Sequence, residues 1–376
     1  MNRHLFTFWL LIICTALLHA DFPEVGPGMT YICERSGDTP WAVFALKIDR
    51  SRTDLHLTTM LSNDKIFGLE TVPEMAKNLP KEMGKPVAAV NGDWFDLPAG
   101  PYQGDLLNTF IHHGELLSLP SWGDTFWIDA KDQPHLDKAE ITLNAVWADG
   151  SKTPLALDGP RKDDGAALYT PVLGASTHTK DGRELVLEKS GDDPWLPLRI
   201  GHTLTAKIKE IRETGDSPIP ADGIVLSIGP NIKPQPTVAI GDKITFSATS
   251  TPDLTGSETA IGGGPTLIRD GKITDFGKGE QPRHPRTIVG WNDTHLYFIV
   301  VDGRRANWSA GMTNSEEAEL VQRLGCTNAI NLDGGGSSTL WLNDQIMNMP
   351  SDGKPRPVGN GLVVVRREER RVKREE

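Results

Sequence analysis

The sequence predicts a fold of mixed β-sheets with a few packed helices, and three observations indicate it. Glycine (38 residues) and proline (27 residues) are abundant, which favours many turns and short elements. Short apolar runs alternate with turn signals such as Asp149-Gly and Asp222-Gly, as in strands joined by tight turns. One helix is marked by the capping box Thr313-x-x-Glu316 and by the terminating Gly325. We therefore expect strands to dominate and helices to pack on them.

The first 20 residues have the pattern of a secretory signal peptide. Arg3 and His4 precede an apolar run over residues 5–18, and Ala20 is the small residue at the expected cleavage position. The run has about 14 residues, fewer than the roughly 20 that a membrane-spanning helix needs. We expect a secreted or periplasmic protein with no membrane span after cleavage.

The remaining composition is that of an ordinary globular domain. Hydrophobic residues make up 38% of the chain and charged residues 24%, with a mean hydropathy of −0.33. The formal net charge of −11 argues against a nucleic-acid partner. We expect one domain over residues 21–365, with core motifs at 85–110 and 260–362, a mainly β middle segment at 112–260, and a charged tail at 366–376.

Two cysteines remain after removal of the signal peptide, Cys33 and Cys326. In an oxidising compartment they would form one disulfide, and two buried free thiols are the alternative. Two cysteines without a nearby pair of histidines do not make a zinc site.

The expected elements follow in a consistent order. Strands are expected at 41–48 and 55–59, then a helix at 72–79 that ends before Pro80, then a buried strand at 87–90. After the mainly β middle, a hairpin strand follows Pro265, and strands at 288–291 and 296–301 flank a turn. The capped helix at 314–324 precedes a strand at 329–332, and a last strand lies at 361–365.

The segment 296–332 is expected to form one β-α-β unit. If its two strands are parallel neighbours, both end at the same edge of the sheet, where ligands bind in such folds. Asp302 and Asp333 stand at these two ends. Asn91-x-Asp93 follows an apolar strand in the same way as Asn331-x-Asp333, so we expect Asn91 and Asp93 at a comparable position.

The loop Asn331-Leu-Asp333-Gly-Gly-Gly-Ser-Ser-Thr339 is the strongest candidate for a ligand site. Its glycines permit positive φ and a close approach of backbone N–H groups to an anion, and its hydroxyls add donors. A tight structural turn is the alternative. The expected ligand contacts are Gly335, Gly336, Ser337, Ser338 and Thr339.

Cationic side chains near the same edge are candidates for phosphate binding. Arg286 follows Pro285, so its backbone is expected to be extended, and an arginine there would clamp a phosphate through two parallel hydrogen bonds. A surface arginine is the alternative. Arg304 has a similar claim, and His284 is either an acid or base or a structural residue.

Several enzyme classes lack their motifs in this chain. There is no Gly-x-Ser-x-Gly elbow, no phosphate loop that ends in Gly-Lys-Ser/Thr, and no His-Glu-x-x-His. Gly262-Gly-Gly-Pro265 is not a dinucleotide fingerprint, because no helix pattern follows it.

Taken in order, the motifs resemble the phosphodiester glycosidase family. The matching pieces are Asn91-Gly-Asp-Trp-Phe95, Leu168-Tyr-Thr-Pro171, Gly174-x-Ser-Thr177, Gly262-Gly-Gly-Pro265, His284-Pro-Arg286-Thr287, Val301-Asp302-Gly-Arg304, Gly311, the loop 331–339 and Asn360-Gly-Leu362. The resemblance covers roughly residues 40–365. It implies an α+β domain that hydrolyses the glycosidic bond of a sugar 1-phosphodiester, such as a GlcNAc-1-phosphodiester. It places Asn91, Asp93, Arg286, Thr287, Asp302, Arg304, Asp333 and Ser338 in the site.

The mechanistic hypothesis rests on carboxylates. Asp302 or Asp333 would activate water or attack the anomeric carbon, Asp93 is the third catalytic candidate, and Arg286 with the Gly-rich loop would stabilise the departing phosphomonoester. One alternative is metal-assisted phosphodiester cleavage, with Asp93, Asp302 and Asp333 holding Ca²⁺ or Mg²⁺. The other is a non-catalytic module of the cell envelope that binds a polysaccharide.

Overall fold

The computed structural model describes residues 24–36, 40–277, 279 and 281–367. The expected signal peptide lies outside the described residues, as does nearly all of the charged tail. Over the described ranges, no helix is long and apolar enough to cross a membrane.

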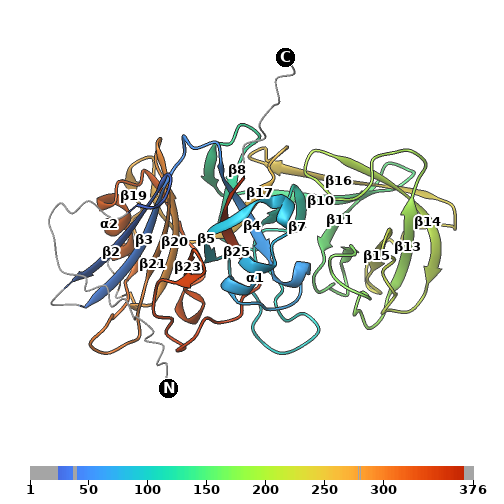
Figure 1. Ribbon diagram of the computed structural model, residues 1–376. Helices are drawn as coiled ribbons and strands as arrows, with labels where there is room; N and C mark the ends of the chain where they lie inside the picture. Colours follow the sequence, from blue (N-terminus) through green and yellow to red (C-terminus); the bar gives the residue numbers. More distant parts are fainter. Residues whose placement is uncertain (1–23, 37–39, 278, 280, 368–376) are drawn as a thin grey trace, which may run out of the picture.

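An eight-stranded antiparallel sheet carries most of the candidate residues (Figure 1). Its order is β1-β2-β3-β21-β20-β22-β18-β19. The strands are β1 (Glu24–Gly26), β2 (Met29–Ser36), β3 (Trp41–Asp49), β18 (Thr266–Arg269), β19 (Lys272–Ile273), β20 (Arg286–Trp291), β21 (His295–Val301) and β22 (Asn328–Asn331).

A five-stranded sheet of order β24-β23-β5-β25-β4 packs against one face of the eight-stranded sheet. Its strands are β4 (Leu55–Leu61), β5 (Lys85–Asn91), β23 (Leu340–Leu342), β24 (Gln345–Ile346) and β25 (Asn360–Arg366). Phe44, Phe298 and Val300 of one sheet and Val90 and Val363 of the other belong to one buried cluster. This sandwich brings the end of β5 next to the end of β22.

A second five-stranded sheet joins the sandwich to a barrel (Figure 1). Its order is β7-β6-β17-β8-β9, with β6 (Phe110–His112), β7 (Glu115–Ser118), β8 (Asp124–Ile128), β9 (Pro134–Asp137) and β17 (Thr259–Gly263). Ile111 and Trp127 of this sheet share a buried cluster with barrel residues such as Phe246, so the barrel packs on it.

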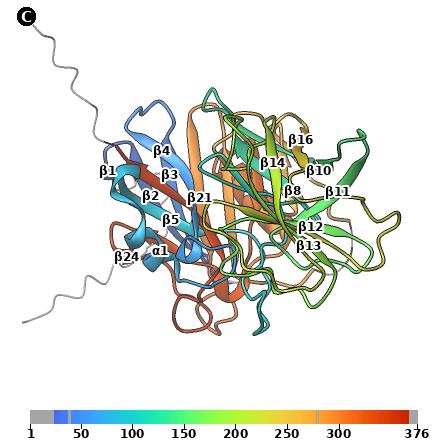
Figure 2. The same cartoon turned by 90° about the vertical axis from the view of Figure 1, so that its right-hand side faces the viewer.

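The mainly β middle segment closes into a seven-stranded barrel (Figure 2). Its strands are β10 (Glu140–Val146), β11 (Lys152–Leu157), β12 (Ala166–Tyr169), β13 (Arg183–Lys189), β14 (Thr203–Arg212), β15 (Ile224–Ile228) and β16 (Lys243–Thr251). Buried and exposed residues alternate along β16, as expected when one face of a closed sheet fills its interior.

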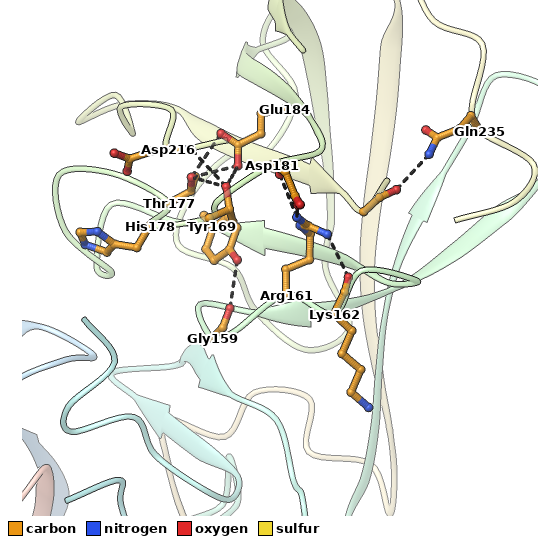
Figure 3. Close-up of polar contacts among 12 residues, drawn as sticks. Gly159, Arg161, Lys162, Tyr169, Thr177, His178, Asp181, Glu184, Asp216 and Gln235 are labelled. Carbon is orange, nitrogen blue, oxygen red and sulfur yellow. Dashed lines mark hydrogen bonds and ion pairs between the residues drawn. The ribbon is translucent and has the colours of Figure 1, made fainter. Parts of the chain in front are cut away.

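Buried polar side chains of the barrel find their hydrogen-bond partners within the barrel (Figure 3). The buried Glu184 carboxylate accepts hydrogen bonds from the Thr177 and Thr179 hydroxyls at 2.9 and 2.6 Å and from the Ser217 N–H at 2.7 Å. The Tyr169 hydroxyl donates to the Gly159 carbonyl at 3.0 Å. A buried carboxylate with this many donors is a structural element.

The predicted α+β class is wrong, because the chain is almost entirely β. The described residues contain two α-helices, α1 (Val72–Asn78) and α2 (Asn314–Arg323), and the 3-10 turns η1 (Ser62–Asp64), η2 (Lys81–Met83) and η3 (Gly335–Ser337). Both α-helices begin at capping boxes, on Thr71 and Thr313. The β-α-β unit also differs from the prediction: β21 and β22 are parallel, but β20 lies between them and pairs antiparallel with both.

Cys33 and Cys326 lie on opposite faces of the eight-stranded sheet. Cys33 packs against the cluster shared with the five-stranded sheet, whereas Cys326 belongs to the cluster under α2. Cys326 is a free thiol, and burial raises its pKa to about 12. The two cysteines therefore do not form a disulfide with each other.

Candidate active site

Three strands of the eight-stranded sheet bring candidate residues to one edge. Arg286 pairs with Val301, and the Leu332 N–H donates to the Thr287 carbonyl at 2.7 Å. Asp302 and Asp333 therefore lie just beyond the carboxyl ends of β21 and β22, where β20 begins. We call this edge the rim. Because two strand spacings separate β21 from β22, the two Asp backbones are about 10 Å apart.

The end of β5 is joined to the rim through Asn91. The Asn91 side-chain amide donates to the Asp333 carbonyl at 2.6 Å, and its oxygen accepts from the Thr287 hydroxyl at 2.8 Å and from the Thr339 N–H at 3.1 Å. The Asp333 N–H donates to the Gly92 carbonyl at 2.9 Å. Asn91 and Thr287 therefore fix the Gly-rich loop from below, and we assign them positioning roles.

Replacement of Asn91 by Ala is expected to lower stability and activity together. It leaves the Thr287 hydroxyl and the Thr339 N–H without their acceptor, and each unsatisfied buried group costs about 1–3 kcal/mol. We expect a loss of about 2–3 kcal/mol in urea unfolding and a lower kcat in any substrate assay. The control is Gln322→Ala on α2, which removes one exposed hydrogen bond to the Gly271 carbonyl and should change neither quantity measurably. Unchanged stability of Asn91→Ala would contradict the positioning role.

Asp93 lies fully buried behind the rim. Its Oδ1 accepts from the Asn108 amide at 3.2 Å, while Oδ2 has no hydrogen-bond partner within the described part of the chain. Burial raises the pKa of Asp93 to about 7, against the hydrogen bond from Asn108, and the nearby Asp333 raises it further. A Cβ at Gly262 would lie 2.9 Å from Asp93 Oδ2 and collide with Asn108, so this glycine allows the close approach.

Asp333 is only partly buried, whereas the other two candidate aspartates, Asp93 and Asp302, are buried. Its surroundings nevertheless raise the pKa of Asp333 to about 6, because the effect of burial exceeds that of the Ser337 hydroxyl, the Gly334 N–H, Arg356 and Arg304, which lower it. A partly accessible carboxylate with a pKa near 6 is ionised at neutral pH and basic enough to accept a proton.

Two guanidinium groups lie over the glycines that follow Asp333. A Cβ at Gly335 would be 3.0 Å from an Arg304 nitrogen, and a Cβ at Gly336 would collide with Arg356. Arg304 also lies 3.2 Å from Nδ1 of His284, whose pKa is lowered by burial, by Arg304 and by Arg286. The neutral His284 and the Arg304 guanidinium therefore offer nitrogen groups beside Asp333 that suit an anion, whereas Arg356 shares its place over Gly336 with its ion-pair partner Asp352.

Sequence reasoning did not identify Arg356. It lies in an irregular segment, where it pairs with Asp352 at 2.8 Å, and no motif marks it. Its position beside the Gly-rich loop follows only from its close approach to Gly336 in the structure.

The hydroxyls of the Gly-rich loop lie beneath its surface. Ser337, Ser338 and Thr339 are at most 1% exposed, and the Ser338 and Thr339 hydroxyls have no hydrogen-bond partner among the described residues. The Gly335 N–H donates to the Pro285 carbonyl at 2.9 Å, so part of the loop backbone is used by the turn itself. Ligand contacts by Gly335, Gly336 and the three hydroxyl residues stay predictions.

Asp302 is buried and engaged by other groups. Its carboxylate accepts from the Trp308 indole at 2.7 Å, the Asn348 amide at 3.0 Å and the Met349 N–H at 2.9 Å. Burial raises the pKa of Asp302, and these donors lower it. The geometry fits an anchor for the segment around Asn348, whose amide also donates to the Ser338 carbonyl at 3.0 Å.

Arg286 faces α2 rather than the Gly-rich loop. Its Nε donates to the Met312 carbonyl at 2.9 Å and lies 2.8 Å from a Glu317 oxygen, and the Glu317 side chain is 0% exposed. Arg286 therefore forms an ion pair with α2 in this structure, and its role as a phosphate clamp stays a prediction. Glu317 was missed, although it stands at helical spacing with Leu320, Val321 and Leu324 on the apolar stripe of α2.

A metal site is not evident in the side-chain arrangement. Over the described ranges, no group of three or more His, Cys, Asp and Glu residues is placed to hold a metal ion. Asp93 and Asp333 are neighbours, but the Asp302 carboxylate is held by its own three donors.

Part of the chain is similar to known proteins. The model of the phosphodiester glycosidase family matches residues 205–365. The SPbeta prophage-derived uncharacterized protein YomE of Bacillus subtilis (strain 168) is 40% identical over 83 residues, which are 22% of this chain and 13% of YomE.

Solved structures share the fold. A hypothetical protein from Synechocystis superposes with a TM-score of 0.72 at 20% identity, over 91% of this chain and 62% of the other. A Burkholderia pseudomallei K96243 protein, named as an exported protein, gives 0.67 at 20% identity, over 87% and 74%. The catalytic domain of zebrafish N-acetylglucosamine-1-phosphodiester alpha-N-acetylglucosaminidase gives 0.49 at 16% identity, over 93% and 86%.

The chain spans less than two thirds of the Synechocystis structure and a small part of YomE. The family match includes the end of β21, all of α2 and the Gly-rich loop, which are the segments that build the rim. The resemblance inferred from the motifs is thus confirmed over residues 205–365, where the model of the phosphodiester glycosidase family matches.

Proposed function

We propose that the protein is an exported hydrolase that cleaves the glycosidic bond of a sugar 1-phosphodiester and releases the sugar and a phosphomonoester. The observation that carries the proposal is the Asp333 carboxylate at the rim, with its raised pKa and with Arg304 and Arg356 beside it. The family match supports the reaction class. The signal-peptide pattern of residues 1–20 and the exported name of the Burkholderia relative support the localisation.

The chemistry follows from this arrangement. Asp333 accepts a proton from water as the water oxygen bonds to the anomeric carbon. The bond between that carbon and the phosphate oxygen breaks, and its electron pair leaves with the phosphomonoester. The added negative charge on the phosphate is stabilised by Arg304 and Arg356. Because phosphate is a good leaving group, this route needs little help from a general acid. Direct attack by Asp333 on the anomeric carbon is the alternative first step.

The two buried aspartates support Asp333 in this proposal. Asp93 is fully buried whereas Asp333 is partly accessible, so loss of solvation favours the protonated form more strongly at Asp93 and leaves the negative charge on the accessible carboxylate. Asp302 anchors the segment that packs on the Gly-rich loop. Both act through other groups and are positioning residues.

The test is a hydrolysis screen of sugar 1-phosphodiesters in which both products are identified. The reaction is run in H₂¹⁸O: a free sugar together with an unlabelled phosphomonoester supports glycosidic cleavage, because attack of water on phosphorus would place the label in the phosphate. A sugar 1-phosphate with a free alcohol means P–O cleavage and contradicts the proposal. Binding without turnover, unchanged in Asp333→Asn, would instead indicate a polysaccharide-binding module of the cell envelope.

Hydrolysis is expected to survive exhaustive chelation of divalent cations. In the proposed mechanism the arginines stabilise the charge of the leaving group, and Asp302 is already occupied by its donors. The measurement is the rate after dialysis against EDTA, with and without added Ca²⁺ or Mg²⁺. A rate that falls more than tenfold and returns with one cation would favour the metal-assisted alternative.

A further inference from the structure

Two indole rings form an aromatic pair at the edge of the candidate site. The rings of Trp94 and Trp122 lie 4.9 Å apart at an interplanar angle of 59°. Trp122 is 43% exposed, so much of its surface faces solvent. Single exposed apolar side chains are common, but this one is backed by a second indole and held in place.

The pair is connected to the buried Asp93. The backbone N–H of Trp122 donates to Asn108 Oδ1 at 2.9 Å, and the Asn108 side-chain amide donates to Asp93 Oδ1 at 3.2 Å. Trp94 follows Asp93 directly in the chain. The backbone segments that carry both indoles are therefore connected to the residues that hold Asp93.

The strand order places the aromatic pair and the arginines on opposite sides of Asp333. Gly264 precedes β18, its N–H donates to the Asn331 carbonyl at 2.7 Å, and a Cβ there would lie 3.5 Å from the Trp122 ring. Along the rim, β18 neighbours β22 on one side, whereas β20 and then β21 follow on the other, and Arg304 extends from β21. Asp333 therefore lies between Trp122 and Arg304.

We propose that Trp122, supported by Trp94, is a binding subsite for the sugar ring of the substrate. A pyranose presents a face of C–H groups with partial positive charge, which stacks on the electron-rich face of an indole. With the sugar on Trp122 and the phosphodiester against Arg304 and Arg356, the bond between them lies above Asp333. This orientation rests on the proposed function, whereas the sugar subsite itself is tested by binding alone.

The experiment measures binding in the Asp333→Asn variant, which removes turnover. The probe is the methyl phosphodiester of N-acetylglucosamine 1-phosphate, with dimethyl phosphate as a probe that lacks the sugar. The ¹⁵N-indole signals are followed by NMR, and the Trp122 signal is assigned by its loss in Trp122→Phe. Affinity is measured by calorimetry in added Trp122→Ala, Trp122→Phe and Trp195→Ala variants. Trp195, a barrel residue that donates to the Asp222 carbonyl, is the matched control.

We expect the sugar probe, but not dimethyl phosphate, to shift the Trp122 signal. Trp122→Ala should weaken binding about tenfold, Trp122→Phe much less, and Trp195→Ala not at all. No binding, or equal affinity in Trp122→Ala, overturns the subsite. If these results are obtained but the native protein hydrolyses no sugar phosphodiester, the subsite stands and the proposed function fails. If the native protein turns over the substrate but affinity is unchanged in Trp122→Ala, the proposed function stands and the subsite fails.

Discussion

Asp333→Asn is expected to lower kcat for a sugar 1-phosphodiester by about 10³-fold or more, because removal of a general base or nucleophile of this kind has effects of this order. Asn has the same shape and cannot accept the proton. The measurement is steady-state hydrolysis with purified protein. Asp293→Asn, which neutralises an exposed turn carboxylate outside the rim, is the control and should retain full activity. Native activity in Asp333→Asn would exclude Asp333 as the catalytic group.

The pH dependence gives an independent check on the same residue. The base must be ionised, so kcat/KM should rise as the pH increases through about 6, which is the pKa of Asp333. The Asp333 pKa is raised above the ordinary value of 3.8. Protonated Asp333 therefore contributes to the free energy of unfolding fully below pH 3.8, and this contribution is lost as the pH rises through 6. Asp333→Asn removes this loss, so the variant should be at least as stable as the native protein at pH 7. A less stable variant would point to a structural role.

The rim was predictable because strand ends can be located from the sequence. Asp302, Asp333 and Asn91-x-Asp93 each follow an apolar run, and all lie at the strand ends where they were expected. β21 and β22 are parallel although β20 lies between them, so their carboxyl ends still meet at the same edge of the sheet. The turn between β20 and β21 was visible in the sequence, but the pairing of β20 with β22 was not, because it depends on packing across the whole sheet. The same limit hid the barrel, whose closure depends on pairs such as β10 with β16, about 100 residues apart.

Side-chain direction at the rim was less predictable than position. Arg286 and Arg304 both stand next to strand ends, yet one pairs with a buried glutamate and the other reaches Gly335. In β20, alternate residues face opposite sides of the sheet: Thr287 reaches Asn91, whereas Arg286 faces α2. The helical spacing of Glu317 with the apolar residues of α2 could have indicated the ion pair, because a buried carboxylate on an apolar stripe is stabilised by a buried cation.

Arg286→Leu is expected to destabilise the fold by about 1–3 kcal/mol at neutral pH, since it leaves the Met312 carbonyl without its donor and removes the cation beside the buried Glu317. This loss of stability should grow at alkaline pH. Burial raises the pKa of Glu317 to about 8 although Arg286 lowers it, and without Arg286 the pKa rises further. Between the ordinary value of 4.5 and about 8 the folded native protein and the folded variant both keep Glu317 protonated and lose stability in parallel, so the extra loss in the variant begins above about 8. Urea unfolding at about pH 7 and at about pH 9.5 measures the difference.

The neighbouring pair Arg283 and Glu316 provides a control for this prediction. Their ion pair is 2.5 Å long but exposed at 44% and 19%, so Arg283→Leu should cost less than about 1 kcal/mol. Adding Glu317→Gln to Arg286→Leu removes the carboxyl that titrates, so the extra loss of stability at alkaline pH should disappear, and KM should be native. If the double variant recovers its stability but its KM stays more than tenfold above the native value, Arg286 contacts the substrate, which would support the phosphate-clamp hypothesis. The double variant thus separates an arginine that holds α2 against the sheet from one that binds the leaving phosphate.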